Sequence, residues 1–416
     1  MSGVAIGIDI GTSGVRAALV DAARAPLAWG AATVAAGHRR DPLAWWRGVE
    51  QALGDLRAAA DLGGVRAIAV DGTSGTVVAI DAAGTPLGPA SMYNDPADPA
   101  LVARVAAVAP QESAAHGATS PLAKLLGLQD AAGIARMVHQ ADWVLGRLCG
   151  RFDVSDENNA LKTGYDPVAR RWPDWLDRLG ARRSLLPEVV EPGTAVAALT
   201  ASVRARFGLP AGAVVVAGTT DGCAAFLATG ADEIGDGVSS LGSTLTIKLL
   251  SDTPVFAPRY GIYSHRLGGR WLPGGASNTG GAALLRHFDA AGIARLSAAI
   301  DPARDSGLEY YPLPGPGERF PIADPHMMPC ETPRPADDAA FLHGLLEGIA
   351  RVEALAYCRL AELGAPRLRR LRSVGGGAGN ATWTKLRARI VGAEVAPARS
   401  EEAAVGTAGL ALQAIG

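Results

Sequence analysis

An acidic residue interrupts an apolar run near the start of the chain. Asp9 lies inside VAIGIDIGTSG, and it is followed by Gly11, Thr12 and Ser13. Backbone N–H groups in a turn of this kind bind anionic oxygens, whereas a neighbouring carboxylate repels phosphate unless a cation lies between them. The pattern predicts a phosphate site at Thr12 and Ser13, with Asp9 facing Mg²⁺. A hairpin with a surface aspartate is the competing interpretation of this turn taken alone.

Three later stretches place glycines or hydroxyl residues before a helix. In AGTTDGCAAFLATGA (217–231), Asp221 occupies a Thr and Gly turn before a run of small residues. The stretches GASNTGGAALL (275–285) and SVGGGAGNATWTKLRARIVGAEV (373–395) each indicate a strand, then glycines, then a helix. Such glycines let a ligand approach the backbone, and a helix amino terminus favours phosphate.

These candidate residues need an α/β scaffold to position them. The runs VAIGIDI, VRAALVD, VRAIAVDG and TVVAID have the character of strands, and 41–63 has that of an amphipathic helix. Residues 8–21 can be laid over 239–252, which predicts two domains that each begin with a hairpin, although the second copy has Ser240 where the first has Asp9. Gly208, Pro210 and Gly212 predict a domain boundary near Pro210.

Composition narrows the class of protein. The chain has 416 residues, 48% hydrophobic and 19% charged, which predicts a globular protein of two or three domains. A net charge of -2 with scattered arginines argues against nucleic acid or a membrane surface as the main partner. Four widely spaced cysteines and the lack of a leader or a long apolar run predict a cytoplasmic protein with reduced thiols.

In this order, the motifs resemble those of the FGGY family of carbohydrate kinases, within the actin, hexokinase and Hsp70 ATPase superfamily. The likeness covers nearly the whole chain and includes SPLAKLLGL (120–128), in which Gly127 replaces an expected aromatic residue. It implies an α/β fold of two ribonuclease H-like, actin-like ATPase domains that face an interdomain cleft. Residues 1–209 are expected to hold the sugar site and the first phosphate and metal element, and residues 210–416 the catalytic aspartate, the second phosphate element and the adenosine site.

The resemblance also implies roles for single residues. Asp221 matches the catalytic base and also contacts the sugar, and Asp9 matches the metal-binding and substrate-binding carboxylate. The expected nucleotide and phosphate contacts are Gly11, Thr12, Ser13, Gly242, Ser243, Thr244, Gly376, Gly377, Asn380 and Trp383. Trp383 either covers the purine or belongs to the core.

Sugar specificity is expected in the first domain. The resemblance assigns Ser74, Asn94 and Asp95 to the sugar, with Asp156 and Asn158 as weaker candidates that capping of helices would equally explain. The xylulose kinase version of the first motif carries Gln and His after its Ser-Gly, whereas this chain has Thr76 and Val78 nearby. This departure weakens the case for xylulose.

The likeness is greatest to compact D-ribulose kinases, so the expected reaction transfers the γ-phosphate of ATP to D-ribulose, giving D-ribulose 5-phosphate. The expected cofactors are ATP and Mg²⁺, and the expected assembly is a monomer or homodimer. Alternative acceptors are xylulose, ribitol and glycerol, and an actin- or Hsp70-like ATPase switch is the alternative of another class. A P-loop is not indicated, because the single Lys-Thr pair, Lys162 and Thr163, follows Leu161. GGGAGN does not match the Rossmann fingerprint.

Overall fold

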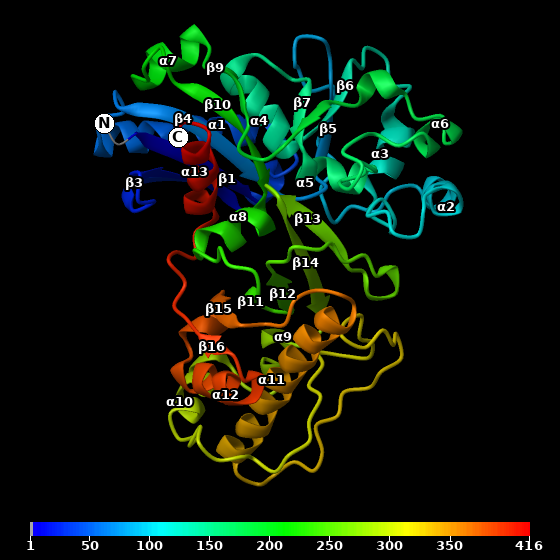
Figure 1. Cartoon of the computed structure of the whole chain (residues 1–416), viewed down its shortest axis with the longest axis vertical. Helices are drawn as coiled ribbons and strands as arrows, with labels where there is room; N and C mark the ends of the chain where they lie inside the picture. Colours follow the sequence, from blue (N-terminus) through cyan, green and yellow to red (C-terminus); the bar gives the residue numbers. More distant parts are fainter. Residues whose placement is uncertain (1–2) are drawn as a thin grey trace. The chain divides into compact units, whose positions relative to one another are not determined.

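The computed structural model describes residues 3–416, which divide into two compact units. The first unit contains residues 3–228, His265–Gly268 and Glu402–Gly416, and the second contains Thr229–Ser264 and Gly269–Glu401. Both units are built from strands and helices, as expected for a two-domain α/β fold (Figure 1). The predicted boundary near Pro210 lies within the first unit, because the strand that follows it pairs with a strand of that unit.

The first unit is organised around a mixed sheet with the strand order β3-β2-β1-β4-β10-β9. β1 and β2 are antiparallel, whereas β1, β4 and β10 run parallel. The strands of this sheet are β1 (Val4–Gly11), β2 (Gly14–Val20), β3 (Pro26–Thr33), β4 (Val65–Gly72), β9 (Ala195–Ala198) and β10 (Val214–Thr220). Two smaller pairs are β5 (Val77–Ile80) with β6 (Arg136–His139), and β7 (Val154–Asp156) with β8 (Glu188–Val190).

Helices pack against both faces of this sheet, α1 (Pro42–Ala59) on one face and α13 (Ala403–Gln413) on the other. The other helices of the first unit are α2 (Pro99–Val108), α3 (Pro121–Leu128), α4 (Gln140–Cys149), α5 (Glu157–Ala160), α6 (Trp175–Arg178), α7 (Ala201–Phe207) and α8 (Asp221–Ala228). Short 3₁₀ turns occur at Ala36–His38, Leu161–Thr163 and Arg183–Leu185. The predicted helix over 41–63 is confirmed as α1, which begins after Asp41, whose side chain caps it by accepting the Leu43 N–H.

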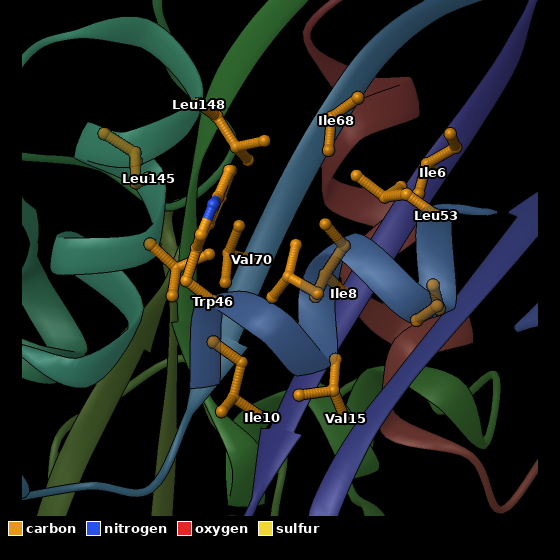
Figure 2. Close-up of a cluster of buried hydrophobic side chains, with 14 of the residues drawn as sticks. Ile6, Ile8, Ile10, Val15, Trp46, Leu53, Ile68, Val70, Leu145 and Leu148 are labelled. Carbon is orange, nitrogen blue, oxygen red and sulfur yellow. The ribbon is translucent and has the colours of Figure 1, made fainter. Parts of the chain in front are cut away.

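Successive side chains of β1 point to opposite faces of the first sheet, so they contribute to the core on both faces. Ile6, Ile8 and Ile10 pack with Trp46 and other side chains of α1, as Figure 2 shows. The opposite face of the sheet carries mainly alanines, which pack against α13. A Cβ at Gly7 would lie 2.0 Å from the carbonyl oxygen of Ala404, so the close approach of α13 to β1 requires glycine there.

The second sheet has the order β13-β14-β12-β11-β15-β16. Its strands are β11 (Asp236–Leu241), β12 (Leu245–Leu249), β13 (Tyr263–Leu267), β14 (Arg270–Ser277), β15 (Arg370–Val374) and β16 (Glu394–Val395). The helices of the second unit are α9 (Gly281–Leu284), α10 (Ala290–Ser297), α11 (Asp338–Glu362) and α12 (Ala381–Val391), with 3₁₀ turns at Pro258–Tyr260 and Gly376–Gly379. Its core is formed mainly by the buried side of the long α11 together with β12 and α12.

The two sheets repeat one arrangement. In each, an antiparallel hairpin, β1-β2 or β11-β12, is followed in the sheet order by a parallel strand, β4 or β15. The predicted match between residues 8–21 and 239–252 therefore corresponds to two equivalent hairpins. Within residues 3–416, no helix is both long enough and apolar enough to cross a membrane.

Candidate active site

Three carboxylates gather where the parallel strands of the first sheet end. The register places Asp9 of β1 beside Asp71 of β4, and Asp71 beside Thr219 of β10. β10 runs directly into α8, whose first residue is Asp221. Carboxyl ends of parallel strands share one edge of the sheet, so residues that lie 62 (Asp9 and Asp71) to 212 (Asp9 and Asp221) positions apart in the sequence meet there. Asp71 was not predicted, although AVDGTSG resembles GIDIGTSG closely enough to have indicated it.

Burial determines the charge state of this cluster. Asp9 is 8% exposed and Asp71 is fully buried. Burial raises the pKa of Asp9 to about 6, and repulsion from Asp221 adds to this shift, although a hydrogen bond with Asp71 opposes it. Burial and the neighbouring Asp9 also raise the pKa of Asp71, whose carboxylate accepts a hydrogen bond from the Thr407 hydroxyl. Asp221 accepts the Gly222 N–H at 2.7 Å.

Both predicted phosphate turns close hairpins. Gly11 pairs with Gly14, which leaves Thr12 and Ser13 as the turn, and Ser13 is exposed. In the second unit, Leu241 pairs with Leu245, so that Gly242, Ser243 and Thr244 form the turn. The carbonyls of Gly242 and Ser243 accept the N–H groups of Gly281 and Ala282 at 2.9 and 3.0 Å, which fixes this turn against the start of α9.

A cavity of about 760 Å³ in the second unit unites distant parts of the predicted nucleotide site. Its lining includes six of the residues predicted to contact nucleotide: Gly242, Ser243, Gly376, Gly377, Asn380 and Trp383. Thr244 is not part of the lining. The volume lies within the range of cavities that hold small-molecule ligands and cofactors.

Asn380 and Trp383 both take part in the structure of the cavity wall. The Asn380 Oδ1 accepts the Trp383 N–H at 3.0 Å and so caps α12, while its Nδ2 donates to the Ser297 Oγ at 2.9 Å. Trp383 is 3% exposed and belongs to the core cluster, yet it also lines the cavity. A Cβ at Gly377 would lie 2.5 Å from its ring, so glycine allows this contact.

The predicted sugar residues lie on two loops of the first unit. The hydroxyl of Ser74 is buried and has no hydrogen-bond partner among residues 3–416, and Asn94 is exposed. Asp95 accepts two hydrogen bonds of 2.5 Å from Arg40 and one of 2.7 Å from the Met92 N–H. Burial alone would raise the pKa of Asp95, but these bonds hold it below its usual value.

A buried lysine supports the same loop. Lys124 donates from its Nζ to the Met92 carbonyl at 2.6 Å, and burial lowers its pKa to about 8 although Asp95 opposes this shift. The SPLAKLLGL stretch resembles a family motif, but no role for this lysine was predicted from it. Its position beside Asp95 results from the packing of α3 near residues 92–95, which the sequence does not reveal.

Gln140 holds the turn that carries Ser74. Its Oε1 accepts hydrogen bonds from the N–H and the hydroxyl of Thr73, at 3.0 and 2.7 Å. The Thr73 and Thr76 hydroxyls lie 2.6 Å apart, and the Thr76 Oγ1 accepts the Tyr93 N–H at 3.0 Å. This chain of bonds joins the turn to the loop of Asn94 and Asp95, so the two sugar elements are fixed to each other.

The weaker sugar candidates are buried and bonded internally. Asp156 caps α5 and accepts the N–H groups of Asn158 and Asn159, and Asn159 also donates its Nδ2 to Asp156 at 2.6 Å. Asn158 donates to the Thr219 Oγ1 and to the Arg266 carbonyl, both at 2.9 Å, and its Oδ1 accepts the Arg266 N–H. These bonds match the structural alternative of helix capping and packing.

Comparison with known proteins identifies the family. Models of the N-terminal and C-terminal domains of the FGGY family of carbohydrate kinases match residues 4–228 and 237–415. The chain belongs to the FGGY family of carbohydrate kinases. It is therefore an ATP-dependent carbohydrate kinase, as the motifs predicted.

Individual relatives agree with this assignment. A xylulose kinase of Klebsiella pneumoniae is 28% identical over 349 residues, which cover 77% of this chain and 71% of the relative. A solved structure titled as a xylulose kinase of Rhodospirillum rubrum has a TM-score of 0.84 at 25% identity and covers 99% of this chain and 90% of its own. A xyloylose kinase structure from Brucella ovis has a TM-score of 0.85 at 24% identity, with 98% and 90% covered, and supports the fold.

Proposed function

We propose that this FGGY kinase phosphorylates the primary hydroxyl of a ketopentose, with D-ribulose as the preferred acceptor and D-ribulose 5-phosphate and ADP as products. The observation that carries the chemistry is the set of Asp9, Asp71 and Asp221 at one edge of the first sheet. Phosphoryl transfer depends on positioning and on charge neutralisation more than on covalent chemistry, and such a set supplies a base and a cation site.

The carboxylates fit a divalent cation. Within residues 3–416, no three His, Cys, Asp or Glu side chains are arranged to enclose a metal ion by themselves. Mg²⁺ in kinases is usually held by one or two carboxylates together with phosphates and waters, so it does not need such an enclosure. Asp9 is buried beside two other carboxylates, where a cation would relieve their repulsion. Asp9 is therefore the proposed ligand, and the ion would neutralise charge on the phosphates.

Asp221 is the proposed general base. Its carboxylate accepts the proton of the sugar hydroxyl as the bond to phosphorus forms, and it orients that hydroxyl before the reaction. The N–H groups of the Thr12 and Ser13 turn, and of Gly242, Ser243 and Thr244, are proposed to donate to the phosphates of ATP. The cavity beside Asn380 and Trp383 is proposed to hold adenosine.

The acceptor site is proposed to form around Ser74, Asn94 and Asp95, with Lys124 as a further contact. The unpartnered Ser74 hydroxyl supports this placement, because a buried hydroxyl without a partner costs free energy that a sugar hydroxyl would recover. Among residues 3–416, the ammonium group of Lys124 has a hydrogen bond to the Met92 carbonyl that uses one of its three donors.

The preference for D-ribulose rests on two substitutions. Where xylulose kinases carry Gln and His after the Ser-Gly, this chain has Thr76 and Val78. The Thr76 hydroxyl is fully buried and bonded to Thr73 and Tyr93, and Val78 is a core residue with 1% exposure. Neither side chain offers a free polar group to the sugar, whereas a Gln and a His side chain both carry hydrogen-bonding groups. The acceptor site of this chain is therefore proposed to differ from that of the xylulose kinases.

D-Xylulose is the second candidate, because the relatives described above are named xylulose kinases. Both candidate acceptors can be tested by measuring ADP release with D-ribulose, D-xylulose, ribitol and glycerol. The phosphorylated carbon of each product is then identified. We expect kcat/KM for D-ribulose to exceed that for every other acceptor by about tenfold or more, the discrimination that lost polar contacts provide. A higher kcat/KM for D-xylulose would reverse the assignment. Asp221→Asn protein from a parallel preparation controls for contaminating kinases.

A further inference from the structure

We infer that Glu318 is a positioning residue for the phosphates of ATP. It holds the segment Ser277–Thr279, and that segment fixes the phosphate turn of residues 242–244. The inference rests on the proposed placement of ATP in the second unit, and it adds a residue that is not part of the lining of the nucleotide cavity. It follows from a continuous series of hydrogen bonds between Glu318 and the turn.

Glu318 is a buried carboxylate on a long loop. It lies between α10 and α11 and is 3% exposed. Its Oε2 accepts the hydroxyl groups of Ser277 and Tyr311 at 2.5 and 2.9 Å. Its Oε1 accepts the N–H groups of Asn278 and Arg319 at 2.8 and 2.9 Å. Burial of a carboxylate costs free energy unless donors satisfy it, and here four donors do so.

The segment Ser277–Thr279 is bonded to this loop at each of its residues. Besides donating to Glu318, the Ser277 Oγ accepts the Thr279 N–H at 3.1 Å. The Thr279 hydroxyl donates to the Pro312 carbonyl at 2.6 Å. The Asn278 Nδ2 donates to the Gly317 carbonyl at 2.9 Å. The backbone at the end of β14 therefore takes its position from the loop between α10 and α11.

The same segment fixes the phosphate turn. The Leu245 N–H, directly after the turn, donates to the Thr279 carbonyl at 2.7 Å. Gly280 has a φ of 138°, and a Cβ there would lie 2.8 Å from the carbonyl carbon of Thr244. The start of α9, which follows Gly280, donates to the carbonyls of the turn as described above. A shift of this backbone therefore moves the N–H groups that are proposed to bind phosphate.

Glu318→Gln changes these bonds without changing the size of the side chain. Whichever way the new amide turns, its nitrogen faces donors that have lost their acceptor. Hydrogen bonds to phosphate depend on the alignment of the donors, and that alignment depends on the supporting bonds. We therefore expect the part of nucleotide affinity that comes from the phosphates to decrease. The wall formed by α10 and α12 keeps its own bonds, so adenosine is expected to bind as before.

Calorimetry with ADP and Mg²⁺, and with adenosine, measures the two parts separately. For Glu318→Gln we expect the ratio of the ADP Kd to the adenosine Kd to rise by about tenfold or more, which is the loss of about one hydrogen bond to a charged group. The KM for ATP is expected to rise while the KM for D-ribulose does not. A ratio within threefold of wild type in the folded variant overturns the inference, as does tighter binding of ADP.

Two other results separate this inference from the proposed function. Wild-type protein that binds no ADP overturns both the inference and the proposed nucleotide site. If Glu318→Gln weakens ADP binding as expected but the wild-type protein phosphorylates no sugar, the proposed function fails and the inference stands.

Two further variants complete the test. Ser277→Ala removes one donor and keeps the carboxylate, so it serves if Glu318→Gln does not fold; we expect the ratio to rise by about threefold or more, and an unchanged ratio overturns the inference. Glu347→Gln is the control, because Glu347 is a fully buried carboxylate of α11 that accepts the N–H and the hydroxyl of Ser306. It is expected to lower the melting temperature and to leave the ratio unchanged. An equal rise of the ratio in this control overturns the inference.

Discussion

Asp221 stands at the first position of α8, where a carboxylate serves either as a base or as a cap of the helix. Asp221→Asn preserves shape and capping but removes the basicity. We expect turnover to fall by roughly 10²- to 10⁴-fold, while the KM for ATP changes little, because the carboxylate acts on the acceptor hydroxyl. Steady-state kinetics at saturating sugar, with a thermal melt to show that the variant is folded, provide the measurement. Near-normal turnover of a folded variant would restrict Asp221 to capping.

Asp156 makes stability depend on pH in an unusual direction. Burial, together with the nearby Asp142, raises its pKa from 3.8 to about 7, although the donors from Asn158 and Asn159 oppose this shift. Between these two values the folded protein retains a proton that the unfolded chain has lost, so this residue makes the free energy of unfolding decrease as pH rises. Its contribution to stability is complete below the unfolded pKa and is lost as pH rises through about 7.

Asp156→Asn removes this dependence. The Asn159 Oδ1 has no partner within residues 3–416, so the Asn159 amide has the freedom to turn and accept from the new side chain. One pKa unit corresponds to about 1.4 kcal/mol. We therefore expect the free energy of unfolding of the variant, minus that of wild type, to increase by on the order of a few kcal/mol from pH 4 to pH 8. Urea titrations of both proteins at several pH values measure the difference. A constant difference would show that Asp156 is ionised in the folded protein.

At the residue scale, the sequence groups candidate residues correctly in space where a side chain and its neighbours belong to one motif. Six residues predicted to contact nucleotide line one cavity, because they belong to the turns and the helix start that follow β11 and β15. The predictions missed Asp71, Lys124 and Gln140, which join the candidate site through the register of β1 with β4 and through helix packing. Nor was it predicted that the Asn380 amide is bonded within the wall, since Ser297 lies 83 positions earlier.

At the scale of elements, local signals specified most of the architecture. Alternating apolar residues and turn glycines predicted both hairpins, and amphipathic spacing with an N-cap predicted α1. The partners of α13 could not be predicted in this way, because an alanine-rich helix carries no signal for the strands that it covers. Its place is fixed by close contacts at Gly7 and Gly406 that depend on the absence of side chains.

Gly406 sets the distance between α13 and α8. A Cβ there would lie 2.0 Å from the Ala224 carbonyl oxygen and 2.7 Å from the Ala228 nitrogen. We expect Gly406→Ala to destabilise the protein by about 1–3 kcal/mol, as overpacking does. We also expect lower turnover, because displacing α8 moves Asp221 at its start. Thermal unfolding and kcat measure the two effects.

Gly54 provides the matched control. It lies exposed inside α1, and a Cβ there meets no atom within 4 Å. Gly54→Ala is expected to stabilise the protein by about 0.5–1 kcal/mol and to leave turnover unchanged, because alanine favours the helix. Equal effects of the two substitutions would show that the contact between α13 and α8 has no special role.

In the whole molecule, neither of the two units is one continuous stretch of the sequence. The chain leaves the first unit after Ala228, returns for His265–Gly268, and returns again at Glu402. α13, shown in red in Figure 1, lies against β1, β4 and α8. Strands near the start of the sequence and the helix near its end therefore share one hydrophobic core. Composition and turn signals near Pro210 give no indication of these returns, because each returning segment is short and unremarkable in sequence.

The first unit is therefore expected to depend on the last helix of the chain. Removing residues 402–416 uncovers the alanine-rich face of the first sheet and takes away the Thr407 hydroxyl that donates to Asp71. An exposed apolar face of this size favours aggregation, so we expect the shortened protein to lose its cooperative thermal transition and most of its solubility. Thr407→Val keeps the helix and removes only the hydroxyl, and it is expected to remain soluble with a smaller decrease in melting temperature. If the shortened protein unfolds with the wild-type midpoint, the first unit folds without α13, and the close contacts of Gly7 and Gly406 are a result of folding and not a requirement for it.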